Sequence, residues 1–171
     1  MGMITPEYCR LMARYNAWQN RQIEKALEGV PLEALKADHG AFFGSILGTL
    51  NHLVWGDRMW MSRFHEPREK PEGGIKDSTA LFPTLGAWSA ERFRVDGVIS
   101  RWAMGLHAVE LTGSFRFYSG AMGREVTKPI APCVVHMFNH QTHHRGQVHA
   151  MMTRTGLKAP VTDLFMMPDE E

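Results

Sequence analysis

The sequence contains only two cysteines, Cys9 and Cys133, which lie far apart along the chain. A disulfide framework needs an even set of cysteines at regular spacings, and a zinc ribbon or thiol redox motif needs paired CxxC segments. Neither pattern is present. We therefore predict that both side chains are reduced thiols in the protein core.

The sequence also lacks an excess of charge of one sign. Its 19 Lys and Arg residues nearly balance 18 Asp and Glu residues, and the signs are mixed along the chain without a basic block. Proteins that bind nucleic acid usually carry a basic patch or stripe. We therefore expect no nucleic acid as a partner.

Long hydrophobic runs are absent as well. No apolar run approaches the roughly 20 residues that cross a bilayer. The opening segment MGMITPEYCR is too polar for the core of a signal peptide. The sequence predicts a cytoplasmic protein that has no membrane as a partner.

The composition that is present indicates a folded protein. With 171 residues and 44% hydrophobic content, the chain suits one domain, residues 1–171, with a sizeable core. Apolar residues at helical spacing predict long helices at about 6–28, 42–64, 81–104 and 132–155. The turn-rich SGAMG between alternating apolar residues predicts a short β-hairpin before the last helix. The expected fold is all-α with this hairpin lying across the helices.

Three connecting segments carry further predictions. Residues 65–79 are rich in Pro, Gly and charge, which indicates an exposed loop. Asp38 is a candidate cap for the helix that follows it. The C-terminal segment has apolar residues between prolines and is expected to pack back on the helices.

The most informative stretch is FNHQTHHRGQ, residues 138–147. His140 and His144 are four residues apart, so on a helix they share one face at about 6 Å, which suits two ligands of one metal ion. The apolar flanks indicate burial, where clustered imidazoles are costly unless they are hydrogen-bonded or bound to a metal. His136 and His140 form a second pair with the same spacing. The alternative is a surface helix whose histidines have no chemical role.

A metal ion needs at least one further ligand, since catalytic sites usually take three from protein. His52 is a candidate because it lies on a predicted helix that is apolar around most of its circumference. A lone histidine in such a place is more often a hydrogen-bonded core residue. Cys133 is about 10 Å of helix rise from His140, too far to join an ion that is also held by His144.

Several other polar residues need an explanation. Asp57 falls on an apolar face of the second helix and needs a partner, either an arginine or the far ring nitrogen of a ligand histidine. Residues that flank the histidine pair are expected to make interhelical hydrogen bonds or ion pairs, and none is assigned a catalytic role; they are Asn139, Arg145 and Gln147. Four of the remaining histidines are expected at the surface, at caps or in loops: His39, His65, His107 and His143. The last one, His149, is expected to face nearly away from the histidine pair.

Taken together, these segments resemble the DinB family, also called damage-inducible or YfiT-like metalloenzymes. The resemblance covers nearly the whole chain and rests on YNAWQN, LNHLVWGDRMW, HMFNHQTHHRGQ and a late PVTD. It implies an up-down-down-up four-helix bundle. It also implies a divalent metal ion held by His52, His140 and His144.

The resemblance implies a range of functions rather than one substrate. Relatives include transferases and isomerases that use low-molecular-weight thiols. An ion on three histidines with an open position can bind a thiol or water and lower its pKa, so thiol-dependent S-transfer to a small molecule and hydrolysis are both expected candidates. The alternative is a non-catalytic stress-response protein with a structural metal.

The ion and the oligomeric state are further expectations. Zinc and nickel are expected first, and iron and copper also suit imidazole ligands. The chain has 5 tryptophans and 12 methionines, more than a bundle of this size is expected to bury completely. We therefore predict a homodimer that associates through the helices at about 6–28 and 81–104.

Overall fold

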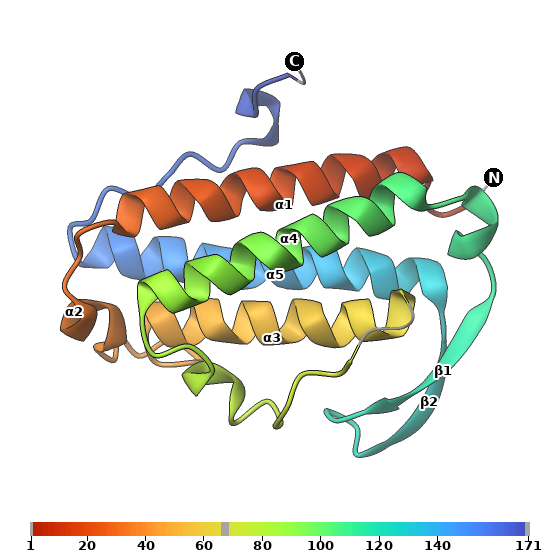
Figure 1. Cartoon of the computed structure of the whole chain (residues 1–171), viewed down its shortest axis with the longest axis horizontal. Helices are drawn as coiled ribbons and strands as arrows, with labels where there is room; N and C mark the ends of the chain where they lie inside the picture. Colours follow the sequence, from red (N-terminus) through yellow and green to blue (C-terminus); the bar gives the residue numbers. More distant parts are fainter. Residues whose placement is uncertain (1, 66–68, 170–171) are drawn as a thin grey trace.

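A computed structural model describes residues 2–65 and 69–169 of the chain. These residues form mostly helix and one small antiparallel sheet (Figure 1). The α-helices are α1 (Pro6–Leu27), α2 (Leu32–Lys36), α3 (Ile46–Phe64), α4 (Leu85–Gly105) and α5 (Ile130–Arg154). The strands are β1 (Ser114–Ser119) and β2 (Arg124–Pro129), and short 3₁₀ turns are η1 (Ser78–Ala80), η2 (Ala108–Leu111) and η3 (Leu164–Met166).

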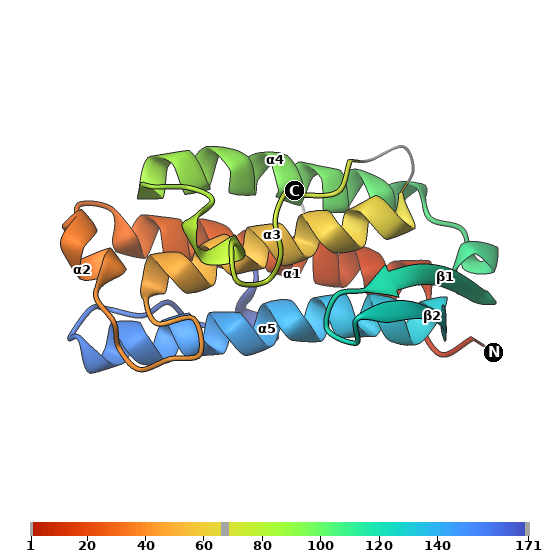
Figure 2. The same cartoon turned by 90° about the horizontal axis from the view of Figure 1, so that it is seen from below.

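The four long helices lie side by side with their axes nearly aligned (Figures 1 and 2). In Figure 1, α1 and α5 run from right to left, whereas α3 and α4 run from left to right. The closest packing is between α1 and α4 and between α3 and α5, and α3 also packs on α4. Helices α3 and α5 therefore meet along their length in opposite directions.

The starts of α1, α3 and α4 are each set by a capping side chain, whereas α5 begins after Pro129 without one. The Thr5 hydroxyl accepts a hydrogen bond from the amide of Tyr8 and starts α1. Ser45 accepts from Gly48 and starts α3, and Thr84 accepts from Ala87 and starts α4. Each cap satisfies an amide that has no partner within the helix.

Two predicted helix starts are therefore wrong by a few residues. The second long helix was expected from about residue 42, but Ala41 and Gly44 form a β-bridge instead, with Gly44 at φ +72°. The third was expected from about residue 81 and begins after its Thr84 cap. Asp38 does not cap α3, because its Oδ1 accepts from the amide of Gly40 at 2.8 Å.

The core lies between the long helices. Its largest fully buried side chains include Leu50 on α3, Trp88 and Ile99 on α4, and Met137 and Phe138 on α5. The indole Nε1 of Trp88 donates to the backbone oxygen of Leu50 at 3.1 Å, so this buried polar group is satisfied. As predicted, Cys9 and Cys133 are buried free thiols.

The predicted hairpin is confirmed. Strands β1 and β2 pair antiparallel, with Phe117 opposite Val126. The hairpin packs on the end of α3, where Phe115 and Phe117 contact Phe64 and Trp60 with ring centroids 5.7 Å apart in each pair. Such a two-stranded sheet is stable only when it packs on another element.

The C-terminal segment lies along α1, above it in Figure 1. It is fastened through its backbone, because the Gln19 Nε2 donates to the oxygen of Val161 at 2.9 Å and Tyr15 donates to the oxygen of Thr162. The apolar side chains expected to bury there stay largely exposed, Phe165 at 87%. No helix in the described residues is long and apolar enough to cross a membrane.

Candidate metal centre

Three histidine side chains from two helices meet in the interior. His52 comes from α3, and His140 and His144 come from successive turns of α5. One ring nitrogen from each lies within 4.8 Å of the others, and the two Nε2 atoms of His52 and His140 are 3.1 Å apart. This is the arrangement of a group that could hold one metal ion.

The orientation of His52 is fixed by Ser78 on η1. The Ser78 hydroxyl donates to the backbone oxygen of Ile75 at 2.6 Å, so its oxygen is left to accept from the His52 Nδ1–H at 2.9 Å. This bond places the proton on Nδ1 and leaves the Nε2 lone pair free. A histidine ligand is commonly fixed in this way by an acceptor behind it.

The segment that carries Ser78 is itself held by α3. The Asn51 amide donates to the backbone oxygens of Thr79 and Phe82, at 2.9 and 3.0 Å. The Trp55 indole donates to the oxygen of Glu72 at 3.3 Å. Helix α3 thus presents His52 and also fastens the segment that orients it.

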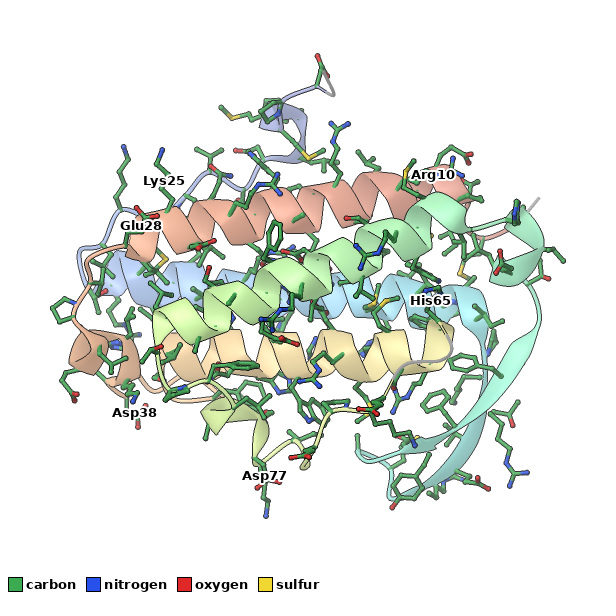
Figure 3. All side chains as sticks on the ribbon, in the orientation of Figure 1. Arg10, Lys25, Glu28, Asp38, His65 and Asp77 are labelled. Carbon is green, nitrogen blue, oxygen red and sulfur yellow. The ribbon has the colours of Figure 1, made fainter. Side chains whose placement is uncertain are left out.

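The prediction that residues 65–79 form an exposed loop is therefore wrong at Ser78, which is completely buried. Asp77, one residue earlier, does project from the loop beside α3 (Figure 3). Its Oδ2 accepts from the amide of Gly74 at 2.8 Å and closes a turn that leads into η1. Residues 66–68 of the predicted loop lie outside the described residues.

His144 is oriented by Gln147 on the next turn of α5. Its Nδ1 lies 2.7 Å from the Gln147 Oε1, which can only accept, so the proton again sits on Nδ1. The amide nitrogen of Gln147 points to the Nε2 of His143 at 3.4 Å, which supports this assignment of the amide. His144 is therefore a second imidazole with a free Nε2 lone pair.

His140 contacts both other rings, with centroids 5.1 Å from His52 and 4.5 Å from His144, and fits against a glycine. A Cβ built on Gly56 would come within 2.9 Å of the His140 Cε1, so only glycine leaves room for the ring at this position of α3. The His140 Nδ1 is buried without a hydrogen-bond partner. With its other nitrogen 3.1 Å from the His52 Nε2, the ring is not satisfied by protein groups alone.

The charge state of the three rings suits metal binding. Burial, with a smaller contribution from the neighbouring His144, lowers the pKa of His52 to about 4 and that of His140 to about 3. Burial also lowers the pKa of His144, against the effect of the Gln147 hydrogen bond. All three are neutral near pH 7, as a histidine ligand must be.

One side of the site is closed by Phe43, which precedes α3. Its ring stacks on His52 with centroids 3.8 Å apart and lies 5.2 Å from the His144 ring. The fractional exposure of His52 is 4% and that of His144 is 7%. The Phe43 ring therefore shields the donor atoms from water on this side.

Two neighbouring histidines stay outside the group. His136 is one turn from His140, with ring centroids 5.9 Å apart, and its ring packs on the edge of Trp60. His143 is exposed and contacts His144 and Gln147 from the side. His65 is the C-cap residue of α3 (Figure 3), and His39 lies in the connection before α3.

The partner of Asp57 is an arginine rather than a ligand histidine. The Arg92 Nη1 on α4 lies 2.7 Å from one carboxylate oxygen, and the Gln141 Nε2 on α5 lies 2.9 Å from the other. Gln141 directly follows His140 in α5. The carboxylate thus joins three helices beside the candidate site.

The same polar cluster extends to α1. Arg92 also pairs with Asp96 at 3.0 Å, and Asn16 and Asn20 donate to the Asp96 carboxylate. Arg145 donates to the side-chain oxygen of Asn16. The predicted interhelical role of Arg145 is borne out, and Asn139 is exposed.

Sequence reasoning missed three residues of the site: Phe43, Gly56 and Ser78. Gly56 carried a signal, because a glycine inside an apolar helix one turn after His52 indicates a close approach. Ser78 and Phe43 carried none, since they lie in segments without periodicity.

Long aligned helices with three convergent imidazoles in their interior define a class: helical proteins with a candidate histidine metal centre. The DinB family model matches residues 3–171, and the chain belongs to the DinB family. Protein DinB of Bacillus subtilis (strain 168) is 26% identical over 169 residues, which cover 92% of this chain and 94% of that protein.

A solved structure gives independent support for the fold. The crystal structure of a DinB-like protein from Bacillus cereus ATCC 10987 superposes with a TM-score of 0.61 at 20% sequence identity. The match covers 84% of this chain and 90% of that chain. At this identity the likeness shows a shared fold.

Proposed function

We propose that this protein is a metal-dependent enzyme in which His52, His140 and His144 bind one divalent ion through their Nε2 atoms. The observation that carries the proposal is the convergence of three neutral imidazoles, of which His52 and His144 have their Nδ1 protons already directed to acceptors. Three protein ligands with a position left for water or substrate are typical of catalytic zinc sites. Zinc and nickel fit this donor set, and iron and copper also bind imidazole.

When bound, such an ion would lower the pKa of a thiol or water in its open position, so that a nucleophile is available at neutral pH. The protein's own contribution is to hold the donors. Ser78 and Gln147 fix two of the rings. Gly56 leaves room for the third ring, and Phe43 excludes water from one side.

The reaction proposed first is thiol-dependent S-transfer. The sulfur of a low-molecular-weight thiol forms a bond to an electrophilic carbon of a small molecule, and the bond from that carbon to its leaving group breaks. The leaving group departs with the bonding electrons, and the thiol proton passes to solvent. The same site would perform hydrolysis if water were the nucleophile.

A structural metal is the second candidate. The burial of His52 and His144 and the Phe43 ring stacked on His52 favour an enclosed ion. A structural zinc site usually has four protein ligands. In the described part of the chain, only three side chains that could bind a metal, all histidines, converge at this place. The number of exchangeable positions on the bound ion therefore separates the two functions.

The proposal also covers the helix topology, the oligomeric state and the location of the protein. The opposite directions of α1 and α5 relative to α3 and α4 support an up-down-down-up four-helix bundle within one domain, residues 1–171. Exposed Phe93 and Met104 on α4 and Leu11 on α1 support a homodimer through these helices. The mixed charge and the two free cysteines support a cytoplasmic location.

Metal analysis of the purified protein, beside a screen for thiol transfer, tests the proposal. The wild-type protein should hold about one divalent ion per chain, and His144→Ala should lose most of it because only two donors remain. His143→Ala is the matched control and should keep the ion. Equal retention by both variants would contradict the assigned ligands, and an ion that depends on His136 would move the site by one turn.

A further inference from the structure

The faces of α3 and α5 that carry the three histidines continue toward the hairpin. On α3, His52, Gly56, Trp60 and Arg63 follow one another at helical spacing, so they share one face. On the antiparallel α5, the matching face carries His144, His140, His136 and Cys133. These eight residues form a strip that runs from the candidate metal centre to the hairpin, and we call it the α3/α5 strip.

Side-chain contacts show that the two halves of the strip are in register. His52 meets His140 at one end. In the middle, the rings of Trp60 and His136 lie 5.3 Å apart. At the hairpin end, burial raises the pKa of the Cys133 thiol, and the charges of Arg63 and Lys128 oppose this shift.

Arg63 is held in an unusual way at that end. Its guanidinium carbon lies 4.6 Å from the ring centre of Trp60 and 4.3 Å from that of Phe117, so two adjoining aromatic rings contact the cation. The Nη2 donates to the backbone oxygen of Tyr118 at 3.1 Å. A guanidinium that packs on aromatic rings keeps its N–H groups in its own plane, where those not used by Tyr118 can donate to a further acceptor.

The edge of Arg63 has no anionic partner among the described residues. No carboxylate in residues 2–65 and 69–169 lies within 4.0 Å of it, whereas Arg58 on the same helix pairs with Glu91 at 3.8 Å. None of the Arg63 nitrogens is both buried and unbonded, so the N–H groups that Tyr118 does not use remain open to solvent. Burial lowers the pKa of Arg63, because part of its guanidinium is desolvated, and the Cys133 thiol acts in the opposite direction.

We propose that Arg63 is the recognition site for a carboxylate of the substrate or cosubstrate, whose reacting group lies at the three histidines. An edge-on guanidinium matches a carboxylate through two parallel N–H to oxygen bonds. This inference rests on the proposed function for the identity of the reacting end. The ligand class is a small molecule with a thiol or electrophilic group at one end and a carboxylate at the other.

The geometry also sets the length of that molecule. Arg63 follows Gly56, which packs on His140, by seven residues, or roughly 10 Å along the helix axis. The side chains between the two ends are Trp60, His136 and Phe117, which favour an apolar or aromatic middle. A linear chain of about eight carbons spans this distance, whereas a three-carbon chain does not.

The first arm of the test uses metal-free protein and measures binding of octanoate and octanol by calorimetry. The wild type should bind octanoate about tenfold more tightly than octanol, since charge-assisted hydrogen bonds stabilise only the carboxylate. Arg63→Met keeps an apolar side chain against the two rings without the charge and should bind both probes equally. Arg63→Lys should keep part of the preference for octanoate. Arg116→Met, which removes a positive charge from the hairpin that Arg63 contacts, should keep all of it.

The readout is the ratio of the two affinities, because a displaced hairpin would weaken both probes alike. Absence of a preference in the wild type, or an unchanged preference in Arg63→Met, overturns the carboxylate site. The second arm titrates cobalt-loaded protein with a terminal mercaptooctanoate and the matching mercaptooctanol and follows the thiolate-to-cobalt absorption band. Tighter binding of the acid than of the alcohol, lost in Arg63→Met, would show that one ligand reaches both ends.

The two arms separate the inference from the proposed function. If octanoate is preferred but neither thiol changes the cobalt spectrum, the carboxylate site stands and the open metal position is wrong. If both thiols change the spectrum with equal affinity and octanoate is not preferred, the metal site stands and the role of Arg63 is wrong.

Discussion

At the scale of single residues, the candidate centre depends on a few contacts that hold imidazole rings in place. Ser78 and Gln147 each accept a hydrogen bond from an Nδ1–H, which leaves the Nε2 lone pairs of His52 and His144 directed inward. His140 has no such acceptor. Its position is determined by shape, through the space above Gly56.

This difference makes Gly56 a specific test. Gly56→Ala should lower metal affinity about tenfold or more, because the new Cβ would lie 2.9 Å from the His140 Cε1 and displace the ring. The same substitution should favour the helical state of α3, since alanine is favoured over glycine by about 1 kcal/mol in a helix. A loss of metal affinity would therefore not be explained by a weaker helix. Competition with a chromophoric chelator would measure the affinity, and thermal unfolding would measure the stability.

The matched control is Gly146→Ala on α5, where an added Cβ has no neighbour within 4 Å. This variant should gain stability and keep the wild-type affinity. If both variants kept full affinity, shape would not be what positions His140.

The histidines differ in how far the sequence could reveal them. His140 and His144 could be predicted as a ligand pair from the sequence, because both lie on one helix four residues apart. His52 needed the resemblance to the DinB family, since it lies 88 residues from the ring it meets. Asp57 was correctly expected to need a partner, but two candidates fitted the sequence equally, and only packing of α3 on α4 selects Arg92.

At the scale of elements, periodicity predicted the four long helices, and SGAMG predicted the hairpin. The starts of α3 and α4 were misplaced because apolar residues continue past the caps at Ser45 and Thr84. The buried η1 segment was missed because Asn51 and His52 recruit it through long-range hydrogen bonds. Such bonds leave no local pattern in a sequence.

The elements are tied together by the buried charges around Arg92. Arg92→Met should destabilise the fold by about 3–5 kcal/mol, because it leaves the carboxylates of Asp57 and Asp96 without their cation in the interior. Urea unfolding followed by circular dichroism would measure the loss. Arg94→Met is the control, since Arg94 pairs with Glu91 at the surface, and it should cost at most about 1 kcal/mol.

A loss of the same small size in both variants would mean that the buried ion pairs contribute no more than surface pairs. The cluster would then serve only to select the arrangement of the helices. Either result bears on α5 directly, because Gln141 links Asp57 to the turn that carries His140.

At the scale of the whole molecule, the buried histidines couple folding to pH. The folded pKa of His52 is lowered to about 4, below its ordinary value of 6.5, so between these values the unfolded chain binds a proton that the folded chain does not. The stability of the metal-free protein should therefore be fully present above about pH 6.5 and fall as the pH decreases toward 4. For His52 the loss is about 2–3 kcal/mol.

Urea midpoints of metal-free protein between pH 7.5 and 4.5, in steps of about half a unit, would measure this effect. His52→Leu should flatten the dependence by removing one titrating group. His107→Gln should keep the wild-type dependence, because that side chain is exposed. A dependence that is unchanged in His52→Leu would contradict the assignment.

The oligomeric state is a property of the surface. The exposed apolar side chains Leu11, Phe93 and Met104 lie on α1 and α4, the helices expected to associate, and Phe93 is 78% exposed. Phe93→Glu should shift a homodimer to monomer in sedimentation velocity, because it places a charge in the interface. Phe42→Glu, at a site 79% exposed outside these helices, should leave the mass unchanged. A monomeric wild type at micromolar concentration would rule the dimer out.

The attachment of the C-terminal segment has a consequence for mutations in it. Tyr15 and Gln19 bind the main-chain oxygens of Thr162 and Val161, which every amino acid supplies. Substitutions in the segment that keep its path along α1 should therefore preserve these hydrogen bonds, whereas substitutions of Tyr15 or Gln19 would remove them. The tail is thus held by the shape of its backbone, and the helix beneath it supplies the specific side chains.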